Sequence, residues 1–132
     1  MKIRKFIPLL LSTLLFTGCA AARKDMPNTY RQITMDEAVT MMKEESGYII
    51  LDVRRPDEFA VGHIPNAVNV PNESIGTGEI PELPNKDQLV MVYCRSGRRS
   101  KEAADKLVKL GYTNIVEFGG ILDWKGEIVS ET

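Results

Sequence analysis

Two short and almost entirely apolar segments constrain the fold of this chain more than any other feature. Residues 48–53 read Tyr-Ile-Ile-Leu-Asp-Val, and residues 89–93 read Leu-Val-Met-Val-Tyr. A strand with one face in water alternates apolar and polar residues, whereas a nearly continuous apolar strand is typical of a parallel sheet buried on both faces. Both segments therefore predict central strands of a parallel sheet.

Helical patterns alternate with these strands along the chain. Thr34 and Glu37 match a capping box ahead of a helix predicted over residues 35–46, and Gly47 is placed to end it. The remaining predictions are a helical turn starting at Pro56, short strands over 68–70 and 114–118, a loop over 71–87, a helix over 100–110, a turn at 119–120 and a last short helix over 121–126. This alternation predicts the α/β class, with helices on both faces of the sheet.

Size and charge limit the function classes. The chain has 132 residues, of which 43% are hydrophobic and 27% are charged, as expected for one soluble globular domain. Its formal net charge is -1, and its basic residues form no extended cluster. We therefore expect no nucleic-acid partner.

The N-terminus has the pattern of a secretory signal. Three basic residues precede an apolar stretch over 6–16, which is about half of the ~20 residues that a membrane-spanning helix needs. The stretch ends in Leu15-Phe16-Thr17-Gly18-Cys19, which resembles the lipobox of bacterial lipoproteins, where the cysteine becomes the lipidated first residue. Phe16 departs from the usual leucine, so cleavage without lipidation, followed by secretion, stays open.

These observations divide the chain into three parts. We expect a signal peptide over 1–18, a tether over 19–29 that begins with lipidated Cys19, and a folded domain over 30–129. The location would be the extracytoplasmic side of a bacterial cell envelope, with the lipid held in the membrane. Cys94 would then be the only thiol of the folded domain, so its surroundings decide whether it is reactive.

Cys94 begins a basic loop that joins a predicted strand to a predicted helix. The loop continues as Arg95, Ser96, Gly97, Arg98, Arg99 and Ser100. The first N–H groups of a helix lack intrahelical partners and carry the positive end of its dipole, so they favour an anion. Gly97 allows a tight curl that points successive N–H groups at the Cys94 sulfur. We expect Cys94 to be a thiolate nucleophile, and Arg95 and Arg98 to contact an anionic substrate.

Several segments, in this order and with this spacing, resemble a single rhodanese domain. They are 51–54 with 57–59, then 62–71, then 92–100, and finally 118–120 with Trp124. The resemblance implies a three-layer α/β fold and a sulfurtransferase of the thiosulfate sulfurtransferase class. Cys94 would attack the outer sulfur of thiosulfate or a similar small anion, release sulfite and hold the sulfur as a persulfide.

The resemblance also implies the partners. The sulfur would pass to cyanide, to a thiol or to another protein, with a thioredoxin-like protein as one candidate, and no metal or organic cofactor would be needed. Residues 95–100 would bind the donor. Arg99 has a second open role, in which it points away and pairs with a carboxylate such as Asp52 to brace the loop. Asp52 and Arg54, at the end of the first apolar strand, are expected to support the site by ion pairing.

Other interpretations receive less support from the residues. A cysteine phosphatase or arsenate reductase needs an arginine six positions after the cysteine, where this chain has Ser100. A non-catalytic rhodanese-like module that binds a partner or senses thiols at the cell envelope is the main alternative. His63 lies in a Gly-His-Ile-Pro turn and is interpreted as structural rather than as a general base, and Trp124 as packing rather than as a rim over Cys94.

Overall fold

The structure is a computed structural model, which describes residues 28–131. The predicted signal peptide over 1–18, the lipidation of Cys19 and all of the tether up to residue 27 lie outside the described residues and stay predictions. Across the part of the chain that is described, no helix is both long enough and apolar enough to cross a membrane.

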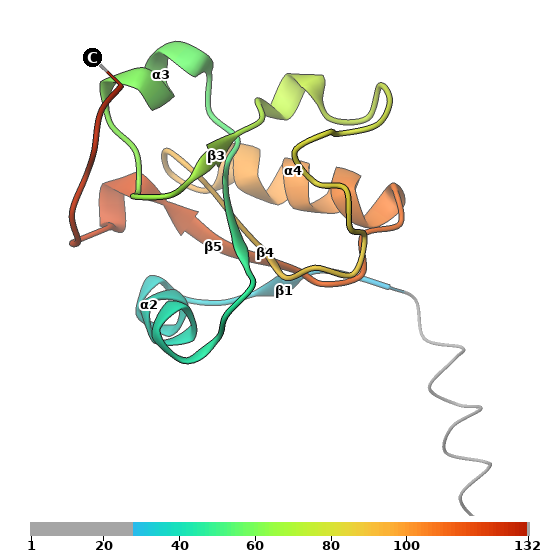
Figure 1. Cartoon of the computed structure of the whole chain (residues 1–132), viewed down its shortest axis with the longest axis horizontal. Helices are drawn as coiled ribbons and strands as arrows, with labels where there is room; N and C mark the ends of the chain where they lie inside the picture. The colour runs from blue at the N-terminus through green and yellow to red at the C-terminus, as the bar shows by residue number, and fades with distance from the viewer. Residues whose placement is uncertain (1–27, 132) are drawn as a thin grey trace, which may run out of the picture.

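A parallel sheet of five strands forms the centre of the domain (Figure 1). The strands are β1 (Arg31–Gln32), β2 (Ile49–Asp52), β3 (Val68–Asn69), β4 (Val90–Cys94) and β5 (Ile115–Gly120). Their order across the sheet is β1-β5-β4-β2-β3, and every neighbouring pair is parallel. β4 lies in the middle with all of its residues buried, as its continuous apolar sequence predicts.

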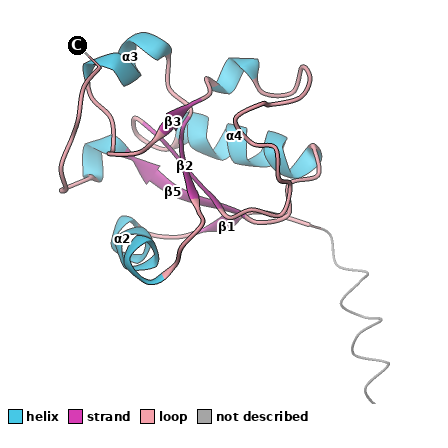
Figure 2. Ribbon diagram, in the orientation of Figure 1, coloured by secondary structure: helices cyan, strands magenta, loops and turns pink. Residues whose placement is uncertain are grey.

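Helices cover the sheet on both faces, which confirms the predicted three-layer α/β fold. Figures 1 and 2 show α2 (Met35–Glu44) on one side of the sheet and α4 (Arg98–Lys109) on the other. α3 (Pro56–Val61) follows the carboxyl end of β2, and the short 3-10 helices η1 (Asn72–Ser74) and η2 (Ile121–Asp123) follow β3 and β5.

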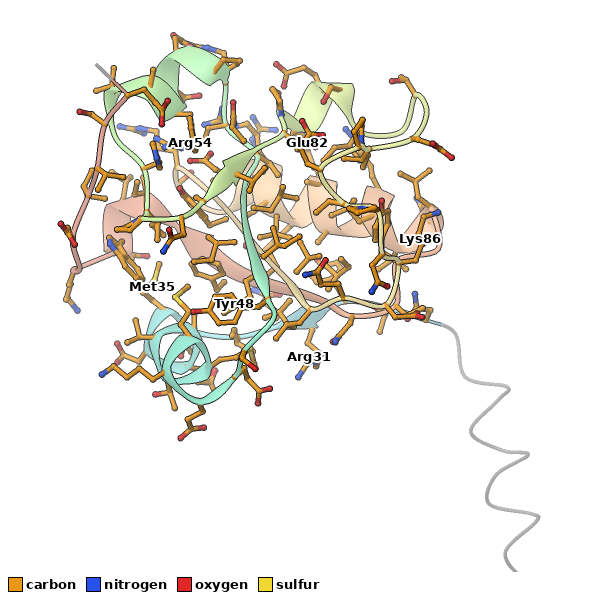
Figure 3. The ribbon with its side chains drawn as sticks, viewed as in Figure 1. Arg31, Met35, Tyr48, Arg54, Glu82 and Lys86 are labelled. Atoms are coloured by element: carbon orange, nitrogen blue, oxygen red, sulfur yellow. The ribbon has the colours of Figure 1, made fainter. Side chains whose placement is uncertain are left out.

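Each face of the sheet has its own apolar core. Leu51 of β2 packs with Leu107 of α4, whereas the preceding Ile50 belongs to the cluster under α2. Met35 and Tyr48 pack against that second cluster, and Figure 3 shows them between α2 and the sheet. Since successive strand residues point to opposite faces, two cores require the unbroken apolar runs that the sequence contains.

The predicted capping box begins α2. The Glu37 backbone N–H donates to Thr34 Oγ1 at 3.1 Å, and the Thr34 N–H donates to Glu37 Oε1 at 2.8 Å. The helix ends at Glu44, two residues before the predicted end, and Gly47 turns the chain with a φ of 72°.

Three element boundaries differ from the prediction. α4 begins at Arg98 rather than at residue 100, because Gly97 adopts the left-handed conformation and serves as its N-cap. The predicted turn at residues 119–120 is wrong, since both glycines continue β5. The final helix is the three-residue η2 instead of a segment reaching residue 126.

Candidate active site

Cys94 lies at the carboxyl end of the central strand, where the polypeptide leaves the sheet. Its side of the sheet is closed by α4, and the residue is only 1% exposed. Cys94 pairs with Gly120 of β5 after a register irregularity that begins at Val92. A Cβ on Gly120 would collide with the Arg95 carbonyl and the Ser96 nitrogen, so glycine is needed there for the loop to pass.

The loop curls back onto the Cys94 sulfur. Gly97 has a φ of 118°, and its backbone N–H donates to Cys94 Sγ at 3.0 Å. This conformation confirms the predicted role of Gly97 in a tight curl. The sequence predicts that successive N–H groups of the loop point at the sulfur. In the described residues, the Gly97 N–H is the one that donates to it.

The three arginines of the loop have different partners. Arg98 is exposed and bonds Glu102 Oε2 at 3.1 Å along its own helix. Arg99 bonds both carboxylate oxygens of Glu58 in α3, at 2.8 and 3.2 Å. Arg95 is exposed and has no carboxylate partner within residues 28–131.

Arg99 therefore follows the bracing alternative, although its partner is Glu58 and not Asp52. The hydrogen bond from Arg99 lowers the pKa of Glu58 to about 2, against the opposing effect of burial. The same bond raises the pKa of Arg99 above its ordinary value, and the nearby Cys94 adds to this increase. The ion pair ties the start of α4 to α3.

Asp52 and Arg54 form a buried ion pair that supports the end of β2. Arg54 Nη2 lies 2.7 Å from Asp52 Oδ2 and also donates to the Gly62 carbonyl at 2.7 Å. The Tyr93 hydroxyl donates to the same carboxylate at 2.6 Å, and it accepts the Ile64 N–H. Burial and then the Asp52 charge raise the pKa of Tyr93. Figure 3 shows Arg54 between β2 and α3, where it holds the turn after α3.

Ser100, one of the residues predicted to bind the donor, is fully buried beside the Cys94 sulfur. Its Oγ lies 3.4 Å from Cys94 Sγ and 2.5 Å from Glu117 Oε2. Glu117 was not among the predicted site residues. The signal that could have found it is an acid inside the apolar run 115–118.

The fold and this cysteine loop match a known family. The family model described as "Rhodanese-like domain" matches residues 34–127. The chain belongs to the rhodanese-like domain family. Since the match covers all three layers and the Cys94 loop, it confirms the family that the sequence motifs indicate.

Several sulfurtransferases are similar to this rhodanese-like domain. A "Sulfurtransferase" of Allochromatium vinosum is 34% identical over 94 residues, which cover 70% of this chain and 86% of the relative. The "Thiosulfate sulfurtransferase PspE" of Escherichia coli is 34% identical over 73 residues, which cover 55% of this chain and 70% of the relative. A solved structure, "rhodanese with anions from E. coli", has a TM-score of 0.58 and 31% identity, and the match covers 63% of this chain and 98% of that structure.

His63 and Trp124 of the rhodanese-like domain both pack against neighbouring residues, as predicted. His63 is buried, stacks on Phe59 with ring centroids 3.7 Å apart, and its Nδ1 lies 2.8 Å from the Phe59 carbonyl oxygen. Trp124 packs in the cluster under α2, and its Nε1 donates to the Glu127 carbonyl at 2.9 Å. The ring partners named here, Phe59 and Glu127, both lie outside the Cys94 loop.

Proposed function

We propose that this chain is a sulfurtransferase that moves a sulfane sulfur from thiosulfate, or from a similar small anion, to a thiophilic acceptor through a Cys94 persulfide. The observation that carries the proposal is the Gly97 N–H, which donates to Cys94 Sγ at the start of α4. Such a donor and the positive end of a helix stabilise negative charge on sulfur. The sulfurtransferase relatives support the same reaction class.

In the first half-reaction, the Cys94 thiolate attacks the outer sulfur of the donor. A bond forms between Sγ and that sulfur, the S–S bond of thiosulfate breaks, and its electron pair leaves with sulfite. Backbone donors aimed at the sulfur atoms stabilise charge as it moves between them. By analogy with oxyanion holes, one such donor contributes about 2 to 4 kcal/mol.

In the second half-reaction, an acceptor attacks the outer sulfur of the persulfide. The carbon of cyanide or a thiolate sulfur forms the new bond, the S–S bond of the persulfide breaks, and the electron pair returns to Cys94. The cysteine itself carries the sulfur, so the two steps need no further redox group. A thioredoxin-like protein is a proposed physiological acceptor.

Arg95 is the proposed contact for the anionic donor. Its guanidinium lacks a carboxylate partner in the described part of the chain, whereas Arg98 is engaged by Glu102 and Arg99 by Glu58. Cys94 is buried where β4, β5 and α4 meet, whereas the next two residues, Arg95 and Ser96, are exposed. The donor therefore approaches from the side of Arg95 and Ser96. An arginine with no carboxylate partner at that entrance suits a doubly charged anion.

Formation of thiocyanate from thiosulfate and cyanide tests this proposal. Wild-type protein should turn over, and Cys94→Ser should form no thiocyanate above the uncatalysed rate. Equal activity in the two proteins would exclude Cys94 as the sulfur carrier.

We also propose that the domain acts on the outer side of a bacterial membrane, anchored by lipid on Cys19. Support comes from the residues of the signal pattern over 1–19 alone. In cells fed radiolabelled palmitate, the wild-type chain should acquire label and Cys19→Ser should not. A secreted, unlabelled wild-type protein would favour cleavage without lipidation.

A further inference from the structure

Glu117 is a buried acid that the sulfur-transfer steps above do not use. It is 1% exposed, and its Oε2 accepts hydrogen bonds from Ser100 Oγ at 2.5 Å and from the Gly119 N–H at 3.0 Å. No lysine, arginine or histidine forms an ion pair with it within residues 28–131. A buried carboxyl without a cation is costly in its charged form, so its place beside the cysteine requires an explanation.

Ser100 connects this acid to the sulfur. Three acceptors surround its hydroxyl: Glu117 Oε2 at 2.5 Å, the Gly97 carbonyl at 2.9 Å and the Gly119 carbonyl at 3.3 Å. The Cys94 thiol lies 3.4 Å from the same oxygen and donates to it. One hydroxyl proton serves one of them fully, and an ionised carboxylate is the strongest acceptor. When Ser100 donates to Glu117, an oxygen lone pair stays available for the thiol proton of Cys94.

We propose that Cys94, Ser100 and Glu117 share one proton. The Cys94 S–H bond breaks as its proton moves to Ser100 Oγ, and the proton of Ser100 moves to Glu117 Oε2. The product is a Cys94 thiolate beside a neutral Glu117. The heavy atoms keep their places, each hydrogen bond reverses direction, and the net charge of the three groups stays at one negative charge.

The coupling follows from the surroundings of the three groups. A thiolate and a carboxylate charged together would place two negative charges in a buried region. The Glu117 charge also acts on Tyr30, whose pKa is raised by burial first and then by Glu117 and Asp105. On the loop side, Arg99 is engaged by Glu58, and Lys101 Nζ lies beside Gly97. Ionisation of Cys94 and of Glu117 therefore oppose each other.

Within the proposed sulfur transfer, on which this part of the inference rests, the shared proton has a use in both half-reactions. Cys94 gives it up when its sulfur attacks the donor, and takes it back when the acceptor removes the outer sulfur. Glu117 acts through Ser100 and is a positioning residue. Ser100 contacts the reacting sulfur itself.

The test measures Cys94 alkylation by iodoacetamide as a function of pH in the full chain, so it needs no sulfur donor. In the wild type, Cys94 should be alkylated at a partial rate at low pH. The main rise of this rate should come at higher pH, when Cys94 and Glu117 are both charged. Glu117→Gln removes the second charge, so a single rise should appear at a pH lower by about one unit. Ser100→Ala should lose the low-pH reactivity and keep the late rise. Glu82→Gln, at an exposed acid (Figure 3), is the matched control and should behave as wild type.

The reciprocal titration decides the question if a variant at Glu117 does not fold. The 13C signal of the Glu117 carboxyl should titrate in two steps in the wild type and in one step in Cys94→Ser, because coupling between two sites acts in both directions. Identical alkylation profiles in wild type and Glu117→Gln, or identical Glu117 titrations in wild type and Cys94→Ser, would overturn the proposal. Both results are independent of whether sulfur transfer occurs.

Discussion

Arg99 and Glu58, 41 residues apart in sequence, join the first turn of α4 to α3 through two hydrogen bonds of 2.8 and 3.2 Å. The contact fixes the helix whose N-terminus faces the Cys94 sulfur. Because the bond from Arg99 lowers the pKa of Glu58 from an ordinary value of 4.5 to about 2, the ionised carboxylate stabilises the folded state. That stabilisation is present above about pH 4.5 and is lost as the pH falls toward 2.

Replacing Glu58 should lower stability in a pH-dependent way. Glu58→Gln is expected to reduce the free energy of unfolding by about 1 to 2 kcal/mol at pH 7, with little difference from wild type near pH 2. Urea denaturation at both pH values measures this. Glu102→Gln is the control, because it breaks the more exposed pair with Arg98 and should cost less than about 0.5 kcal/mol. Equal losses in the two variants at pH 7 would contradict the bracing role of Glu58.

Gly97 should be needed both for the backbone and for the reaction. Alanine at a φ of 118° is strained and should cost about 1 to 3 kcal/mol, and a shifted loop removes the N–H from the sulfur, with a loss of about 100-fold in kcat. Gly47→Ala is the matched control, since Gly47 has a φ of 72° and lies outside the loop. It should lose stability and keep its activity. Thiocyanate assays measure kcat, and denaturation measures stability. A Gly97→Ala variant with full kcat would contradict the role of the Gly97 N–H in the reaction.

Arg95 and Arg98 should differ in their effect on donor binding. Arg95→Ala is expected to raise the KM for thiosulfate about tenfold, as loss of a charged hydrogen bond does. Arg98→Ala should change it less than about threefold, because Glu102 already engages that guanidinium. Steady-state kinetics at fixed ionic strength compares the two. A larger effect at Arg98 would show that the donor displaces Glu102.

The sequence predicted the central elements because their signals are local. Continuous apolar runs identify β2 and β4, and Thr34 and Glu37 identify the start of α2, since each pattern forms within a few residues. β1 was missed because its two residues are polar and exposed. It forms by pairing with β5, more than 80 residues away, as the register of Arg31 with Val116 shows.

The same limit applies to the site. Cys94 and Gly97 could be predicted because one loop contains both and because glycine signals an unusual backbone. The partner of Arg99 could not, since Asp52 and Glu58 both follow β2 and the choice depends on where α3 packs. Glu117 reaches the sulfur only through Ser100, so its role depends on the pairing of β5 with β4.

The intact mass of the purified protein, without residues 1–18, after incubation with thiosulfate shows whether Cys94 takes up a sulfur atom. Wild-type protein should gain one sulfur atom, cyanide should remove it, and Cys94→Ser should gain none. If the wild type gains no mass while Cys94 can still be alkylated, the sulfurtransferase account is contradicted, and a binding or thiol-sensing module becomes the better description.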